Sequence, residues 1–172
     1  MRITAGDLRG RALLPLKDKG VRPTSSKTRE ALFNIIGEVR GFSVLDLYAG
    51  TGAIGFEAIS RGASSASMVE ISSNLLQAIK ETAQKWEIAE KVICHRNDVL
   101  RFAAQTLQSP ERYDLIFADP PFSKEYPDLR IFLPRLNEGG FAIFEVPSRA
   151  MPTWASEAKK VRSYGESSLL IF

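Results

Sequence analysis

The pentapeptide Ala-Asp-Pro-Pro-Phe at residues 118–122 brings together groups that could act on a planar amine. It ends the apolar run 113–118, which is typical of a buried strand. The Asp119 carboxylate and the Pro120 carbonyl can each accept an N–H, and the prolines fix the backbone that presents them. Phe122 can stack on an unpaired base. Because the lone pair of a nucleobase amine is delocalised, holding both of its N–H groups would prepare it to react.

A glycine-rich loop precedes this pentapeptide in the chain. Within residues 44–55, Gly50, Gly52 and Gly55 fit the pattern G-x-G-x-x-G between an expected strand and an expected helix. Such glycines let the backbone approach a ligand closely at a helix N-terminus. Glu70 ends the next apolar run, where a carboxylate commonly binds a ribose. The spacing favours a ligand that carries a nucleoside, and a plain glycine-rich turn is the structural alternative.

A further acid argues against a dinucleotide as that ligand. Asp46 lies four residues before Gly50, where its charge would repel a pyrophosphate but suit a cationic amine or sulfonium. Together these pieces resemble the nucleoside-binding half of S-adenosylmethionine-dependent methyltransferases. The resemblance implies that Glu70 binds the ribose hydroxyls and that Asp98 binds the adenine amine, although Asp98 could simply cap a helix. The residues assigned to the cofactor are Thr24, Asp46, Tyr48, Gly50, Gly52, Glu70 and Asp98.

Strand-like and helix-like segments alternate along most of the chain and predict a parallel α/β sheet with helices on both faces. The expected strands are 43–48, 66–70, 91–95, 113–118, 140–146, 159–163 and 167–172, and the expected helices are 25–38, 53–61, 73–87 and 98–107. The last two strands are joined by a tight connection and should form an antiparallel pair at the end of the sheet. Short extended segments at 2–5 and 10–14 predict an N-terminal β-hairpin.

The composition is that of an average globular domain. A chain of 172 residues with 44% hydrophobic residues suits one domain with its own core. The single cysteine excludes an intramolecular disulfide. No run is apolar and long enough to span a membrane, the start has no signal-peptide core, and no Cys/His cluster has metal spacing. We therefore expect a cytoplasmic protein without a metal.

Basic residues are concentrated at the start of the chain. Residues 1–40 hold nine Lys/Arg and four Asp/Glu, whereas residues 41–172 hold fourteen and sixteen. This asymmetry indicates a polyanionic partner such as nucleic acid, with a solvated charged arm as the alternative. The candidate RNA contacts are Arg2, Arg9, Arg11 and Arg22. We expect residues 1–24 to form an RNA-contacting appendage and residues 25–172 to form the methyltransferase domain.

The whole chain resembles the RsmD-type bacterial ribosomal RNA guanine methyltransferases. The stretches that carry the resemblance are Arg2–Gly6, Gly10-Arg11, Arg22-Pro23-Thr24, Arg29–Ile36, Asp46–Gly52, Glu57–Ala63 and the closing Tyr164-Gly165. The resemblance implies a Rossmann-like class I fold with a seven-stranded sheet, and methylation of the exocyclic amine of one guanine in small-subunit rRNA. It implies S-adenosyl-L-methionine as cofactor and the small subunit, or its assembly intermediate, as partner of a monomer. The pentapeptide residues Asp119, Pro120 and Phe122 are then catalytic.

Other readings remain open at this point. Adenine amino-methylation of DNA or RNA would use the same groups, and so would glutamine methylation of a protein, although those enzymes usually show Asn before Pro-Pro. A non-catalytic ribosome-assembly factor could keep the fold, and a nicotinamide oxidoreductase could use the glycine loop. Three residues depart from the family pattern. Tyr48 and Thr51 keep the size or the hydroxyl of the usual residue, and Phe122 keeps the stacking ring.

Overall fold

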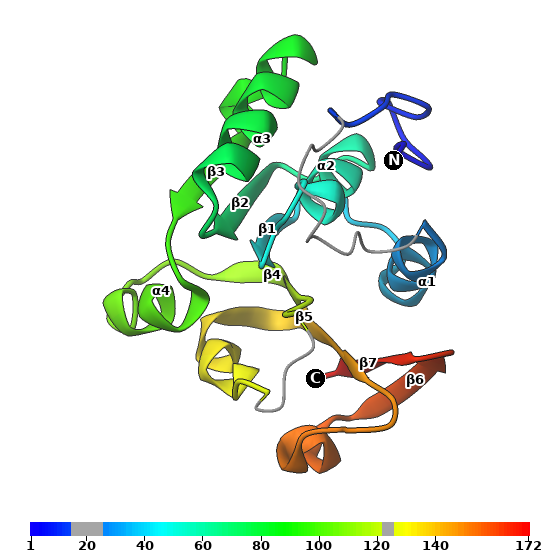
Figure 1. The fold of residues 1–172 in the computed structure, drawn as a ribbon, viewed down its shortest axis with the longest axis vertical. Helices are drawn as coiled ribbons and strands as arrows, with labels where there is room; N and C mark the ends of the chain where they lie inside the picture. Colours follow the sequence, from blue (N-terminus) through cyan, green and yellow to red (C-terminus); the bar gives the residue numbers. More distant parts are fainter. Residues whose placement is uncertain (15–25, 122–125) are drawn as a thin grey trace.

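The structure is a computed structural model that describes residues 1–14, 26–121 and 126–172. In this part of the chain, one sheet of seven strands has the order β3-β2-β1-β4-β5-β7-β6 (Figure 1). The strands are β1 (Ser43–Leu47), β2 (Ser65–Glu70), β3 (Val92–Arg96), β4 (Tyr113–Ala118), β5 (Leu136–Pro147), β6 (Lys160–Tyr164) and β7 (Ser167–Ile171). The α-helices are α1 (Ser26–Ile36), α2 (Ala53–Ser60), α3 (Ser73–Lys85) and α4 (Val99–Gln105).

The predicted topology of the sheet is confirmed. Strands β1 to β5 pair in parallel, and β7 lies between β5 and β6, antiparallel to both. The carboxyl ends of β1 to β6 therefore share one edge of the sheet, which we call the carboxyl edge, and the opposite one is the amino edge. In open α/β sheets, ligands bind at the carboxyl edge.

Both faces of the sheet are covered by helices, as the alternation predicted. The strands alternate in the face that they bury, so that Phe117 packs on the side of α1, α2 and α3, while Ile116 and Ala118 pack on the side of α4. The second face is completed by two 3₁₀ helices, η2 (Leu129–Arg135) and η3 (Thr153–Glu157), and a third, η1 (Ala89–Lys91), precedes β3. None of these short helices was expected from the sequence.

Strand β5 is longer than its apolar run suggested. It begins at Leu136 rather than at residue 140, and its first pairing with β4 contains a register shift between Tyr113 and Leu115. Gly139 lies in this segment with a φ of 75°. Glycine is weak in strands and marks bulges, so the apolar pattern concealed the beginning of the strand.

The N-terminal segment packs closely on α2. The predicted hairpin is present in reduced form, because a single antiparallel bridge joins Arg2 to Ala12 and neither arm is a strand. Gly6 approaches α2 so closely that a β-carbon there would lie 1.8 Å from the Ser60 carbonyl oxygen. Leu8 contributes to the core of the domain. The expected domain boundary at 24/25 lies outside the described residues.

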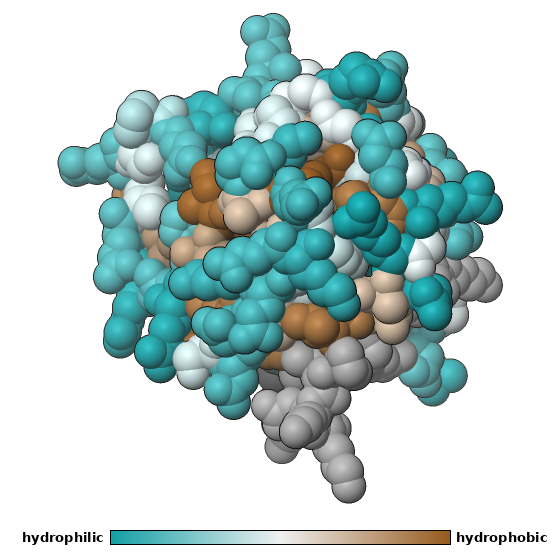
Figure 2. All heavy atoms as spheres, turned by 90° about the horizontal axis from the view of Figure 1, so that it is seen from above, coloured by the Kyte–Doolittle hydropathy of each residue, from teal (hydrophilic) through white to brown (hydrophobic). Residues whose placement is uncertain are grey.

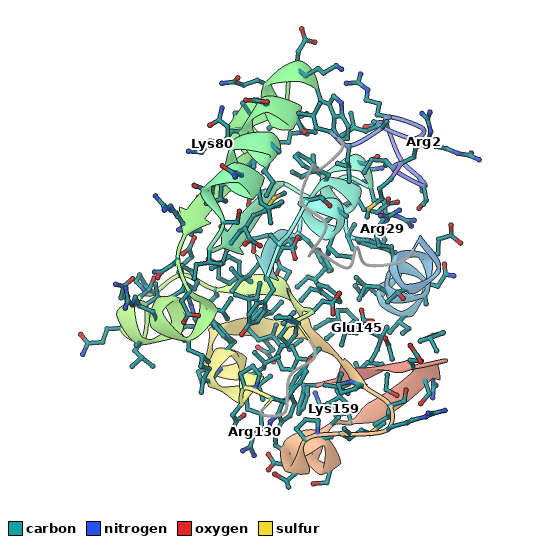
Figure 3. All side chains as sticks on the ribbon, viewed as in Figure 1. Arg2, Arg29, Lys80, Arg130, Glu145 and Lys159 are labelled. Carbon is teal, nitrogen blue, oxygen red and sulfur yellow. The ribbon has the colours of Figure 1, made fainter. Side chains whose placement is uncertain are left out.

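A buried carboxylate on α2 ties this segment down. Glu57 is fully buried and accepts hydrogen bonds from the Thr4 N–H at 2.9 Å, the Thr4 hydroxyl at 2.6 Å and the Ala5 N–H at 3.1 Å. It forms a salt bridge with Arg61 at 3.0 Å and lies 3.8 Å from the buried Arg29. Arg29 in turn donates to the Arg2 carbonyl at 2.8 Å. Figure 3 shows Arg2 and Arg29 on adjacent segments beside α2.

The face that Figure 2 shows, over α3 and the N-terminal segment, is mainly hydrophilic with small apolar areas between charged side chains. No helix in the described ranges is long and apolar enough to cross a membrane.

Candidate active site

The glycine loop after β1 adopts a tightly turned backbone. Tyr48, Gly50 and Gly52 have φ angles of 59°, 56° and 74° in the left-handed region. Gly52 caps α2, and a β-carbon there would lie 3.0 Å from the Met68 sulfur and from the Phe56 ring. Only glycine meets both conditions at this position without strain. Positive φ at Tyr48 is uncommon for an aromatic residue and tends to occur at functional sites.

Asp46 lies beneath this loop on β1. Its side chain is buried and accepts a hydrogen bond from the Gly55 N–H at 3.1 Å. Burial raises the pKa of Asp46 to about 8, the Gly55 N–H opposes this shift, and the charges of Asp119 and Glu70 add to it. Burial thus disfavours the charged form of Asp46, and a cationic group beside it would favour ionisation.

Glu70 connects the glycine loop to the end of β2. One carboxylate oxygen accepts the Gly50 N–H at 2.9 Å, and the other accepts the Ser72 N–H at 2.9 Å. An ionised carboxylate has about four acceptor positions, so two remain for further donors. The side chain is half-buried at the carboxyl edge. Glu70 therefore fits the binding of a pair of hydroxyl groups such as a ribose diol.

Asp98 has the capping role that the sequence left open. Its carboxylate accepts the Arg101 N–H at 3.0 Å at the start of α4, and its side chain is exposed. Burial raises the pKa of the Tyr48 hydroxyl to about 12, and the charge of Asp98 adds to this shift. Two exposed apolar residues, Ile71 and Leu100, lie next in sequence to Glu70 and near Asp98. Ile71 and Leu100 could have been recognised from the sequence as candidate site residues, because each is an apolar residue close to an acid that follows a strand.

The pentapeptide meets the glycine loop at the carboxyl edge. Ala118, the last residue of β4, pairs with Leu47 on one side and with Phe144 on the other. Asp119 therefore emerges between the end of β1 and strand β5, which continues to Pro147, and it is half-buried and followed by the buried Pro120. Its charge contributes to the raised pKa of Asp46. Phe122 lies outside the described residues.

Two residues of this site were missed by the sequence analysis. The Tyr126 hydroxyl donates a hydrogen bond to the Glu145 carbonyl, and its ring lies 6.2 Å from that of Trp154. Burial raises the pKa of Tyr126, and the charges of Asp119 and Glu145 add to this shift. Glu145 is itself buried on β5, one residue beyond the partner of Ala118. Strand register places Glu145 next to Asp119, and the electrostatic interaction with Asp119 places Tyr126 near it, while no sequence motif marks either residue.

The predicted RNA contacts lie elsewhere. Arg11 donates to the Trp86 carbonyl at 3.5 Å, at the end of α3, and Arg2 donates to the Gly10 carbonyl at 2.8 Å. Arg9 is exposed on the same segment. Because α2 and α3 end at the amino edge, these arginines lie at the end of the sheet opposite to Asp119. Arg22 and Thr24 lie outside the described residues.

No group of three or more His, Cys, Asp or Glu in the described ranges could hold a metal ion.

Comparisons with known proteins identify the family and the fold. A family model described as "Conserved hypothetical protein 95" matches residues 1–172. The chain is 31% identical over 150 residues to "Putative rRNA methyltransferase YlbH" of Bacillus subtilis, which covers 84% of this chain and 82% of that protein. It is 35% identical over 124 residues to "Ribosomal RNA small subunit methyltransferase D" of Haemophilus influenzae, covering 71% of this chain and 64% of that protein.

A solved structure shows the same fold over nearly the whole chain. The "Putative methyltransferase yhhF" from Escherichia coli superposes with a TM-score of 0.83 and 26% identity, covering 99% of this chain and 96% of that one. The Rossmann-like methyltransferase fold expected from the sequence is thus confirmed.

Proposed function

The chain belongs to the family described as "Conserved hypothetical protein 95", and we propose that it transfers a methyl group from S-adenosyl-L-methionine to the exocyclic amine of a guanine in small-subunit rRNA. The observation that carries this proposal is the convergence of two motifs at one edge of the sheet. Asp119 and Pro120 emerge beside the glycine loop and its acids Asp46 and Glu70. Likeness to proteins named as small-subunit rRNA methyltransferases supports the substrate class.

The residues around the glycine loop fit the cofactor. Glu70 has acceptor positions for the ribose hydroxyls, and Asp46 can ionise beside a cationic group of the ligand. The exposed side chains of Ile71 and Leu100 would cover the adenine, while Asp98 accepts from its amine. The cofactor would supply an electrophilic methyl group on a sulfonium.

The pentapeptide would prepare the amine. The Asp119 carboxylate accepts one N–H and the Pro120 carbonyl the other, so that the nitrogen lone pair can leave conjugation with the ring. As the N–C bond forms, the bond between the methyl group and the sulfonium would break and leave a neutral thioether. The Asp119 carboxylate would stabilise the positive charge that develops on the nitrogen, until an N–H proton is released to water. No histidine or metal is needed for these steps. Phe122 would stack on the base.

The partner and setting follow from the same proposal. The substrate is rRNA in the small subunit or its assembly intermediate, and the protein acts as a monomer in the cytoplasm. The N-terminal appendage, including Arg2, Arg9, Arg11 and Arg22, would contact RNA away from the reacting base.

Methyl transfer from radiolabelled S-adenosylmethionine tests the proposal directly. The purified protein is incubated with small ribosomal subunits that lack their own methylation, and an Asp119→Ala variant serves as the matched control. Label should enter the RNA with the unmodified protein only. Label in ribosomal protein, or no label in any ribosomal particle while the cofactor still binds, would contradict the proposal.

A further inference from the structure

On one side of the pentapeptide, the strands of the sheet extend farther toward the carboxyl edge than β4 does. Strand β4 ends at Ala118, which pairs with Phe144, whereas β5 continues to Pro147 and pairs there with β7, which pairs in turn with Tyr164 of β6. Three residues of strand extend about 10 Å. Residues 147–149 and 162–167 thus form a raised border beside Asp119, which we call the carboxyl-edge rim.

The rim carries cations that face solvent. Arg149 and Arg162 are exposed, and neither forms a salt bridge with another described residue. Lys159 and Lys160 are also exposed and continue the basic surface along β6, and Lys159 is labelled in Figure 3. Glu166, at the turn between β6 and β7, is the carboxylate of the rim. Basic side chains therefore outnumber acidic ones along this border.

The pairing of β6 with β7 and of β7 with β5 places Arg162 at the same level of the sheet as the pentapeptide. Arg162 pairs with Leu169, and Leu169 pairs with Glu145, which lies beside Asp119. The two strands β4 and β6 are three strand spacings apart, or about 14 Å. An arginine at this distance is placed to reach a phosphate next to a base that is held at Asp119.

Hydroxyl groups hold the rim together. The Ser168 hydroxyl, fully buried on β7, lies 2.9 Å from the Ser148 hydroxyl on one side and 2.9 Å from the Ser163 hydroxyl on the other. Three hydroxyls that share two hydrogen bonds keep one donor for an outside acceptor. Ser163 is exposed, and serine hydroxyls commonly donate to phosphate oxygens. The chain of serines thus links the end of β5 to β7 and β6 and keeps one hydroxyl donor at the rim.

Charges on an edge strand often serve another purpose, because they prevent pairing with a second chain. This explains the cations on the edge strand β6, Lys160 and Arg162, but not Arg149, which follows β5, nor the extension of the rim beyond the end of β4. The arginines Arg2 and Arg11 lie at the amino edge and cannot hold the backbone next to the reacting base. In Figure 3, Arg2 lies well apart from Glu145 and Lys159.

We propose that the carboxyl-edge rim binds the phosphate backbone of the substrate RNA on either side of the methylated nucleotide, with Arg149 and Arg162 as its principal contacts. This inference rests on the proposed methylation of RNA. It assigns substrate binding to the end of the sheet that the basic N-terminal segment does not occupy.

The test is the salt dependence of RNA binding by an Arg149→Gln, Arg162→Gln double variant. Affinity for the small-subunit substrate should fall by about tenfold or more, and the slope of log K against log salt should flatten by about two, one for each lost phosphate contact. A matched control, Arg40→Gln with Lys80→Gln, removes the same charge from exposed positions outside the rim and should leave both quantities within twofold of the unmodified protein. Arg149→Lys with Arg162→Lys keeps the charge and should largely restore the slope.

Binding of S-adenosylmethionine and the melting temperature are measured for each variant, to show that the pocket and fold persist. RNA affinity and salt slope that match the unmodified protein would overturn the rim proposal while leaving the methylation intact. An equal loss in the control pair would also overturn it, because the effect would then be one of net charge. The transfer assay tests the proposed function separately from RNA binding. If the unmodified protein methylates no RNA in that assay, the proposed function is wrong, whatever the binding experiment shows.

Discussion

Asp119 is the residue on which the proposed chemistry depends most. It emerges between the end of β1 and strand β5, so that Tyr48 and Glu145 follow the pairing partners of Ala118, and its charge acts on Tyr126. The pentapeptide and the two strand-end acids could be recognised from the sequence because short motifs mark them. Tyr126 and Glu145 could not be recognised in this way. The pairing of β5 with β4 brings Glu145 to the site, and the fold of the chain after the pentapeptide brings Tyr126 there, and no local sequence pattern encodes either placement.

Replacing Asp119 by Asn should separate catalysis from cofactor binding. The amide keeps the size of the side chain but loses the charge that stabilises the developing positive nitrogen. We expect turnover to fall by about 100-fold or more, with cofactor affinity unchanged within twofold. Single-turnover methyl transfer and calorimetric titration measure the two quantities. Turnover close to that of the unmodified protein would remove Asp119 from the mechanism.

Asp46 should make the protein less stable as pH rises. Its folded pKa of about 8 exceeds the ordinary value of 3.8, so the folded state binds more protons than the unfolded state between these values. The contribution of this group to the free energy of unfolding therefore falls as pH increases through that window. Asp46→Asn should remove this part of the slope when unfolding in denaturant is compared at pH 6 and pH 8. An exposed control, Glu90→Gln, should keep it, and equal slopes for all three proteins would contradict the assignment.

At the scale of elements, the N-terminal segment is bound to α2 by polar groups as well as apolar ones. The regular alternation of strands and helices predicted the sheet and its order of elements well. The 3₁₀ helices η2 and η3 were not predicted, because short helices lack a periodic apolar stripe and η2 contains Pro134. The contact between Gly6 and Ser60 spans 54 residues of chain, so no local pattern in the sequence could predict it.

Glu57→Ala should destabilise the protein strongly. The carboxylate is fully buried, and its loss leaves the Thr4 donors without their acceptor and the buried Arg29 without its carboxylate partner. Removing one partner of a buried pair typically costs about 3–5 kcal/mol of unfolding free energy. Denaturant unfolding measures the change, with Glu38→Ala as control. Glu38 pairs with Arg40 at the surface, where such a pair contributes about 0–1 kcal/mol. Similar losses in the two variants would show that the buried network is not what holds the segment.

At the scale of the whole molecule, the two basic surfaces lie at opposite ends of the sheet. The charge asymmetry of the sequence identified the N-terminal one, since its cations are contiguous in the chain. The rim combines residues from the end of β5 and from β6, so only the folded sheet assembles it. A large RNA could contact both surfaces at once, with the reacting base at the carboxyl edge.

Arg9→Gln with Arg11→Gln should therefore weaken RNA binding without changing the chemical step. Loss of up to two phosphate contacts at the amino edge should flatten the salt slope by about one to two. The rate at saturating RNA should stay within twofold, because these arginines lie far from Asp119. Filter binding over a range of salt and single-turnover transfer provide the two measurements. Binding that is unchanged at every salt concentration would contradict an RNA-contacting appendage.

The most direct test of the central claim is the chemical position of the transferred methyl group. Small-subunit RNA methylated by the protein is digested to nucleosides and analysed by mass spectrometry against standards. The account predicts guanosine that carries one methyl group on its exocyclic amine, at a single site. Methylated adenosine, or a methyl group on a ring nitrogen, would show that Asp119 and Pro120 do not hold a guanine amine, and would contradict the account.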